Sequence, residues 1–204
     1  MHNKILASSI KIMANVVVIV FLGLMALSCY RKFHDSGSFN WLGLLIVNSI
    51  MVAMYVAKRD ARSISKSPFL WLLAFAGTCL PLILRPAAPS LTTDAGNIIQ
   101  LIGIVAIAAS MLSLRRSFGI VPAHRGIRTE GLYNFVRHPL YASELFWMFG
   151  FIIANPSGWN IALWLCDCVL QFCRASAEER FLGGDPIYAQ YRGRVKYRLL
   201  PRVI

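Results

Sequence analysis

Apolar and polar residues are segregated along this chain into long uncharged runs separated by short basic stretches. A helix needs about 20 mainly apolar residues to cross the hydrocarbon core of a bilayer. Four runs approach this length and are predicted to be transmembrane helices, at residues 12–30, 41–57, 68–84 and 95–114. Pro81 lies inside the third run and is expected to kink or end that helix.

The apolar stretch from Pro139 to Cys173 has a different pattern, because the sequence Asn-Pro-Ser-Gly at 155–158 interrupts it. This composition is a strong turn signal. The arm on either side is short for a full span, so we predict a helical hairpin over 139–173 that enters the membrane and returns. The predicted fold class is an all-α integral membrane protein with four transmembrane helices, this C-terminal hairpin and cytosolic loops.

Composition supports a membrane protein. The chain is 57% hydrophobic and 15% charged, whereas a soluble domain carries about a quarter charged residues. A net charge of +12 suggests nucleic acid as the partner of a soluble protein, but here the charges are excluded from the apolar runs, so no nucleic-acid partner is expected. The five cysteines lie in or next to apolar runs with no C-x-x-C pair, and we expect neither a metal site nor a structural disulfide.

The distribution of Lys and Arg predicts the orientation. With a cytoplasmic N-terminus, eighteen of the 21 Lys and Arg residues fall on the cytoplasmic side, and only Arg31, Lys32 and Arg85 fall on the other. Both termini are therefore predicted to be cytoplasmic. The longest polar stretches, 115–138 and 174–204, then face the same compartment, and a functional site is expected there.

Each polar stretch contains candidate binding groups. His138-Pro139 marks the start of a helix, whose free N–H groups favour an anionic or polar ligand. Arg174 and Glu178 are four residues apart and share one helix face. Residues 137 and 174 are equally far from the predicted turn, so Arg174 is expected near the His138 region, and Glu144 near Asp167 about two turns deeper.

Taken singly, these residues have plainer interpretations. Arg137, Arg174 and the basic tail from Arg192 to Arg202 are also typical of anchors at lipid headgroups. The acidic pair Glu178-Glu179 is also typical of a solvated helix face. Tyr133, Tyr141, Tyr188 and Tyr191 are also typical of an interfacial aromatic belt.

Together, the motifs are more specific. The sequence R-G-I-x-T-x-G-x-Y at 125–133 is followed by R-H-P-x-Y at 137–141, a hairpin, R-x-x-x-E-E at 174–179 and Y-x-x-Y at 188–191. This order resembles the isoprenylcysteine carboxyl methyltransferase family and the wider phospholipid methyltransferase group. The resemblance covers about residues 115–201.

The resemblance implies that residues 115–204 bind S-adenosylmethionine at the cytosolic face, whereas 1–114 forms the transmembrane region. A lipophilic or prenylated acceptor, and membrane lipids, are the implied partners. Arg174 resembles the arginine that holds an acceptor's carboxylate, and Glu178 a further cofactor contact; these two are the predicted catalytic residues. The implied cofactor-binding residues are Arg125, Gly126, Ile127, Arg128, Tyr133, His138, Pro139, Leu140, Tyr141 and Glu178.

The predicted activity is thus S-adenosylmethionine-dependent methyl transfer to a lipophilic acceptor, with a carboxylate favoured. N-methylation of a phospholipid or other lipid amine is the alternative, with Glu178 or Glu179 as the base that takes the proton. A non-enzymatic membrane scaffold is a further alternative. A transporter is disfavoured because the first four predicted helices carry no charge.

Overall fold

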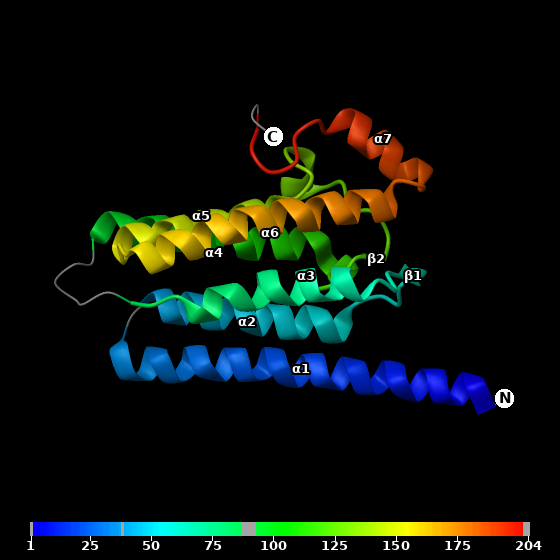
Figure 1. Cartoon of the computed structure of the whole chain (residues 1–204), viewed down its shortest axis with the longest axis horizontal. Helices are drawn as coiled ribbons and strands as arrows, with labels where there is room; N and C mark the ends of the chain where they lie inside the picture. The colour runs from blue at the N-terminus through cyan, green and yellow to red at the C-terminus, as the bar shows by residue number, and fades with distance from the viewer. Residues whose placement is uncertain (1, 38, 87–92, 202–204) are drawn as a thin grey trace. The chain divides into compact units, whose positions relative to one another are not determined.

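The computed structural model describes residues 2–37, 39–86 and 93–201, without the side chains of 2–12, 14 and 36. The chain is 75% helical with almost no sheet (Figure 1), which confirms the all-α fold class. Its helices are α1 (His2–Ser36), α2 (Phe39–Ala57), α3 (Pro68–Cys79), α4 (Asp94–Leu114), α5 (Pro139–Ala154), α6 (Gly158–Leu182) and α7 (Pro186–Arg194). The strands β1 (Ser63–Ile64) and β2 (Ala123–His124) pair antiparallel.

The chain divides into two compact units, Met1–Ala57 and Lys58–Ile204. In the first unit α1 packs against α2, and the amide of Asn48 donates to the backbone oxygen of Leu44 at 2.8 Å. The second unit contains α3 to α7, and therefore every predicted site residue. The assignment of residues 1–114 to a transmembrane region and of 115–204 to cofactor binding stays a prediction.

Three helices in the described part of the chain are long and apolar enough to cross a membrane: Asn15–Asp35, Phe39–Ala57 and Asp94–Ser117. The third predicted span is shorter. Its α-helix ends at Cys79 and continues as a 3-10 helix, Leu80–Ile83, that contains Pro81, as expected where proline interrupts the hydrogen-bond ladder. The total of four spans therefore stays a prediction.

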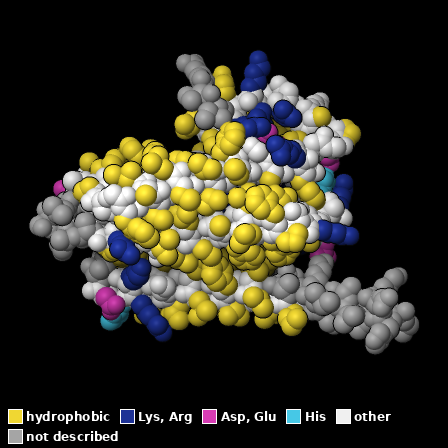
Figure 2. All heavy atoms as spheres, in the orientation of Figure 1, with side chains coloured by type: hydrophobic (Ala, Val, Ile, Leu, Met, Phe, Trp, Pro, Cys, Tyr) yellow, Lys and Arg dark blue, Asp and Glu magenta, His cyan; other side chains and the backbone are white. Residues whose placement is uncertain are grey.

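Apolar side chains cover the outside of the second unit. Leu72 on α3, Val105 on α4 and Val169 on α6 are 67%, 68% and 63% exposed. Figure 2 shows one face, on which hydrophobic side chains spread along the helices while Lys and Arg lie toward the helix ends, one group of them near α7 and another at the lower left. Extended apolar surface of this kind requires a partner such as lipid, and it agrees with an integral membrane protein.

Small residues bring α4 and α5 close together. A Cβ atom at Gly96 would clash with the backbone nitrogen of Ala154, and one at Gly150 would lie 2.7 Å from that of Gln100. These contacts show that the two helices run antiparallel with their backbones nearly touching. Close approach at small residues is typical of helix pairs in membranes, where dispersion contacts replace the hydrophobic effect.

Helices α5 and α6 follow each other after a short turn. The Ser157 hydroxyl accepts from the backbone N–H of Asn160 and caps α6, and the indole N–H of Trp164 donates to the backbone oxygen of Leu145 at 3.0 Å. Helix α6 extends well past Cys173 to Leu182, so Arg174 and Glu178 do share one helix. The placement of this pair in a membrane as a hairpin stays a prediction.

Candidate functional site

The start of α5 is covered by the C-terminal segment of the chain. The backbone N–H groups of Arg137 and His138 donate to the backbone oxygens of Tyr197 and Arg198, both at 2.9 Å. His138 precedes the first helical residue, Pro139, as the sequence predicts. The first turn of α5 and the segment after α7 are thereby fixed to each other.

Glu179 is the ionic centre of this junction. Its Oε1 accepts from Arg137 Nε at 2.8 Å, its Oε2 lies 3.0 Å from Arg198 Nη2, and its side chain is 4% exposed. His138 Nε2 lies 3.3 Å from the same Oε1. Burial by itself raises the pKa of Glu179, but His138 and the two guanidinium groups outweigh it and lower the pKa to about 2. Both oxygens are engaged, which makes Glu179 a structural anion rather than an available base.

Glu178, its neighbour, is in a different environment. Its side chain is 33% exposed, and its Oε2 accepts from the hydroxyl of Tyr141 at 3.2 Å. His138 Nδ1 lies 3.7 Å from the same oxygen. The rings of His138 and Tyr141 are stacked, with centroids 5.5 Å apart. Three predicted residues from two separate motifs therefore meet at one place, around a carboxylate that solvent can reach.

Arg174 also contacts Tyr141. Its Cζ is 4.6 Å from the centre of that ring, and its Nη1 donates to Gln171 Oε1 at 2.9 Å. The side chain is 8% exposed, yet the nearest carboxylate, Glu144, is 4.0 Å away. Gly77 of α3 leaves room for this cation, because a Cβ there would lie 2.9 Å from Nη1.

A small cavity of about 10 Å³ borders Arg174 and Tyr141. Its other walls are apolar and come from α3, from the loop before β2 and from α6: Leu70, Leu73, Ala74, Ile120, Pro122 and Ala177. A buried guanidinium at the edge of an apolar space is costly unless hydrogen bonds or a counter-charge compensate it. The volume of the cavity is about that of one water molecule, so a larger ligand that pairs with Arg174 needs the apolar walls to move.

Gln171 links further polar groups beneath Arg174. Its Nε2 donates to Glu144 Oε2 at 2.9 Å and to Asp167 Oδ1 at 3.5 Å, which brings the two acids together as predicted. Gln171 was not among the predicted residues. Its position, four residues after Asp167 and three before Arg174, places all three on one face of α6. This spacing is the sequence signal from which Gln171 could have been predicted.

The structure corrects one detail of the predicted helix register. Equal distance from the turn placed 137 opposite 174, but Arg137 pairs with Glu179, and Arg174 lies against Tyr141. Counting residues from the turn assumes two straight antiparallel helices in which residues equally far from the turn face each other. Arg137 instead precedes α5, and the facing side of α6 follows helical periodicity, so the partners differ by about one turn.

The loop at 125–133 packs on the opposite side of this region. Arg125 is 8% exposed, its backbone oxygen accepts from the Ser117 hydroxyl, and Arg128 Nε donates to the same hydroxyl at 3.3 Å. Gly126 has φ +95°, a conformation that favours glycine. Arg125, through its backbone oxygen, and Arg128, through its side chain, are thus hydrogen-bonded to Ser117.

A cluster of buried tyrosines connects that loop to the site. Tyr133, Tyr188 and Tyr191 pack with Val195, and Ile127 lies against them. Burial, together with the charge of Glu178, raises the pKa of Tyr133. Tyr188 and Tyr191 are each 4% exposed, so an interfacial aromatic belt is wrong for these two. The Tyr188 hydroxyl is buried and has no hydrogen-bond partner in the described part of the chain.

Comparison with known proteins decides the family. A family model described as phospholipid methyltransferase matches residues 91–190. This part of the chain belongs to that family. The family includes isoprenylcysteine carboxyl methyltransferases, so the predicted resemblance is confirmed. No curated protein matches the chain.

The match indicates a membrane methyltransferase that acts on lipid-type substrates. Methyltransferases of this family normally use S-adenosylmethionine. The residues present fit that cofactor: the exposed carboxylate of Glu178 and the stacked rings of His138 and Tyr141 suit a cationic group. The Tyr188 hydroxyl adds a buried polar atom that a ligand would complete.

Proposed function

We propose that this methyltransferase moves a methyl group from S-adenosylmethionine to a carboxylate on a lipophilic acceptor, such as an isoprenylcysteine-type C-terminus. The supporting observation is the state of Arg174. A guanidinium has five N–H donors, and in the described part of the chain Arg174 has one hydrogen bond, to Gln171. Arg174 also borders the small apolar cavity, and its remaining donors suit a carboxylate attached to an apolar chain once the walls move apart.

Glu178, Tyr141 and His138 would hold the cofactor in this proposal. When bound, S-adenosylmethionine supplies a methyl group on a positively charged sulfur, so that transfer to a carboxylate needs no base. The protein contributes position: Arg174 orients the acceptor, and Tyr141, which contacts Arg174 and stacks on His138, places the acceptor and the cofactor next to each other. The apolar walls of α3 and α6 exclude water.

The loop at 125–133, which the resemblance assigns to the cofactor, has a supporting role in this proposal. Tyr133 is the member of that loop whose pKa is raised by burial and by the charge of Glu178. Arg125 and Arg128 hold the loop against Ser117. We place Pro139 and Leu140 in the site because they form the first turn of α5 between His138 and Tyr141. Gly126 contributes through its backbone conformation, and Ile127 by packing against the tyrosine cluster, so both would help to shape the loop.

N-methylation of a lipid amine is the second candidate, and Glu178 favours it. An amine must lose a proton when it is methylated, and a partly exposed carboxylate beside the site is a suitable base. Glu179 is not proposed for this role, because its oxygens are held by Arg137 and Arg198. A scaffold without activity would not require the contacts around Arg174 and Glu178.

The deciding experiment supplies purified enzyme with S-adenosylmethionine labelled in the methyl group, and compares a prenylcysteine analogue with phosphatidylethanolamine. A carboxyl methyl ester releases labelled methanol in base, whereas an N-methyl group does not. Base-labile label on the prenylcysteine analogue is expected. Stable label on the phospholipid would favour the amine acceptor, and the absence of both products together with no cofactor binding by calorimetry would favour the scaffold.

We also propose that the site and both chain termini face the cytoplasm, since this places the basic segments of the second unit, including the part after α7, on the cytoplasmic side. Arg202, the last cation counted in the tail, lies outside the described residues. Cofactor would then arrive from the cytosol, and a lipophilic acceptor from the bilayer.

A further inference from the structure

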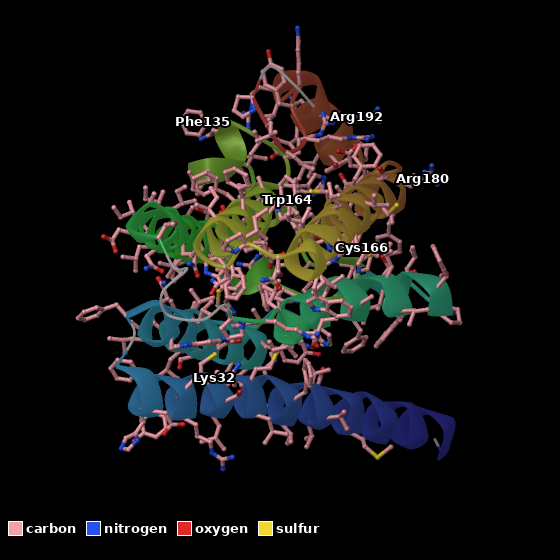
Figure 3. All side chains as sticks on the ribbon, turned by 60° about the vertical axis from the view of Figure 1, so that its left-hand side comes forward. Lys32, Phe135, Trp164, Cys166, Arg180 and Arg192 are labelled. Carbon is pink, nitrogen blue, oxygen red and sulfur yellow. The ribbon has the colours of Figure 1, made fainter. Side chains whose placement is uncertain are left out.

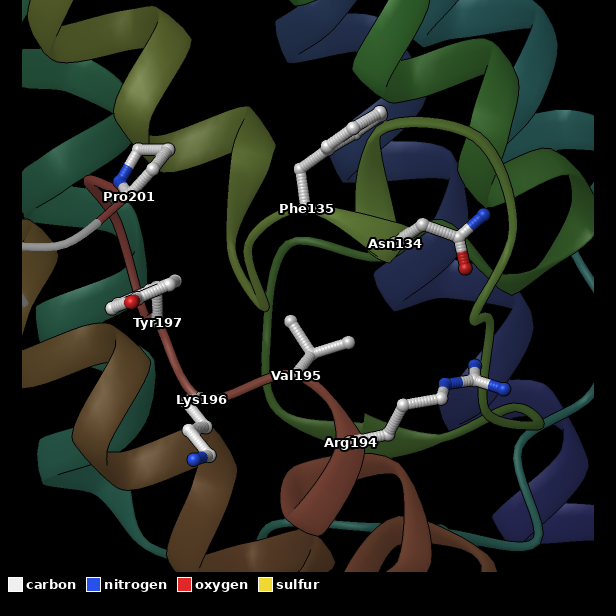
Figure 4. Close-up of a pocket in the computed structure, with 7 residues that line it drawn as sticks. All are labelled: Asn134, Phe135, Arg194, Val195, Lys196, Tyr197 and Pro201. Atoms are coloured by element: carbon white, nitrogen blue, oxygen red, sulfur yellow. The ribbon is translucent and has the colours of Figure 1, made fainter.

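A recess separate from the cavity at Arg174 lies at the C-terminal end of the second unit. Its volume is about 300 Å³, and it is formed by residues 134–135 and 194–197 together with Pro201 (Figure 4). The first segment immediately precedes the R-H-P motif, and the second follows α7. None of these residues has been given a role in methyl transfer.

The lining of the recess is basic. Arg194 and Lys196 are two of its seven lining residues, and no Asp or Glu is among them. Within the described chain neither side chain forms an ion pair with a carboxylate, in contrast to Arg137 and Arg198, which are bound to Glu179. The recess therefore presents two uncompensated cations, which favour an anionic ligand.

The wall that carries these cations is held firmly. Arg137 Nη1 donates to the backbone oxygens of Val195 and Lys196, both at 3.0 Å. The Val195 side chain is 4% exposed within the tyrosine cluster. Arg194 and Lys196 flank this anchored residue, so the backbone of the wall is fixed before a ligand arrives. The two side chains are exposed and point away from each other in Figure 4, so both must turn toward a ligand that they share.

The residues around the recess are of the kinds that proteins place at a membrane surface. Phe135 is 68% exposed and Leu200 is 52% exposed, and Figure 3 shows Phe135 at the end of the unit that also carries Arg192. Aromatic residues and cations together are typical of the headgroup region of a bilayer. Helix α5, which is strongly apolar, begins only four residues after Phe135.

We propose that this recess binds a phosphate group through Arg194 and Lys196, with Phe135 at its edge in the lipid interface. The phosphate would belong to an anionic lipid headgroup or be free in solution. This site is distinct from the methyl-transfer site, and the inference does not depend on the proposed function.

The test is calorimetry on the full-length protein in a non-ionic detergent, with three probes: dihexanoyl phosphatidylglycerol, dihexanoyl phosphatidylcholine and inorganic phosphate. Saturable binding of phosphatidylglycerol, and little binding of the zwitterionic lipid, is expected. The double variant R194Q/K196Q should bind about tenfold more weakly, because each cation near an anionic surface contributes to affinity. Binding of inorganic phosphate alone, with the same dependence on the variant, would assign the site to the free anion.

The matched control is R192Q, which removes an exposed cation of the same segment that does not line the recess. It should change affinity less than twofold, and R194K/K196R should restore binding. An equal loss in R192Q would show diffuse attraction to the basic tail and overturn the proposal, as would no binding of any anionic probe by the wild type.

Titration with S-adenosylmethionine separates this inference from the proposed function. The R194Q/K196Q variant should retain wild-type affinity for the cofactor. A parallel loss of cofactor affinity would mean that the recess is part of the cofactor site, and would overturn the proposal. If the wild type binds phosphatidylglycerol but no cofactor, the proposed function fails and the phosphate site remains.

Discussion

The guanidinium of Arg174 lies over the ring of Tyr141, with Cζ 4.6 Å from the ring centre. The same tyrosine donates its hydroxyl hydrogen to Glu178, so one side chain contacts both the cation proposed to hold the acceptor and the carboxylate proposed to hold the cofactor. Methyl transfer requires the acceptor oxygen and the methyl carbon to be held close together, so groups that bind the two substrates around one side chain favour the reaction. Tyr141 thereby couples the R-H-P-x-Y motif to both functional positions of α6.

The variant R174K should lose about 100-fold or more in turnover while cofactor affinity is retained, because lysine cannot reproduce the planar fork or its stacking on Tyr141. The measurement is methyl transfer at saturating cofactor, beside a cofactor titration. R180K, on the same helix but exposed, is the matched control and should be unchanged. Wild-type turnover in R174K would remove Arg174 from the mechanism.

The variant E178A should weaken binding of S-adenosylmethionine about tenfold, since a solvent-accessible carboxylate next to a cationic ligand is lost. Calorimetry in detergent measures this directly. E130A removes an exposed glutamate from the loop before the site and should have no effect. Unaltered affinity in E178A would contradict its assignment as a cofactor contact.

The variant G77A should reduce turnover without loss of cofactor affinity. The added Cβ would lie 2.9 Å from Nη1 of Arg174, so the flexible guanidinium must move away from its present position. The control is G23A, where a Cβ meets nothing within 4 Å. The result to look for is a decrease in kcat with unchanged thermal stability; equal loss of stability would indicate general overpacking instead.

Glu179 should make the stability of the second unit depend on pH in the acid range. Its pKa in the folded protein is about 2, below the ordinary value of 4.5, so its stabilising effect is complete above about pH 4.5 and is lost as the pH falls toward 2. Thermal unfolding followed by tryptophan fluorescence should show a falling melting temperature over this interval.

The variant E179Q tests the same ion cluster at neutral pH. It should melt at a lower temperature, because Arg137 and Arg198 lose their shared counter-charge, and its melting temperature should depend less on acid pH. E178Q provides the neighbouring control and should keep the wild-type acid dependence. A melting curve of E179Q that coincides with that of the wild type would show that the cluster contributes no stability.

Much of the local structure could be predicted from the sequence. The bounds of α2 and α4, the interruption at Pro81 and the start of α5 at Pro139 follow from apolar run length and from the chemistry of proline. The placement of Arg174 and Glu178 on one face of α6 follows from helical periodicity. These features depend only on residues near one another in the chain.

The tertiary structure alone decided which of the charged residues are available. Arg137 and Glu179 neutralise each other beneath the segment at 195–198, whereas Arg174 and Glu178 keep free capacity near the cavity and solvent. In the sequence, charge and position within a motif do not distinguish these four residues, and only the family resemblance singled out Arg174 and Glu178. Their difference arises from how α5 and α6 face each other and from a tail far away in the chain, and neither a helical period nor a charge count contains that information.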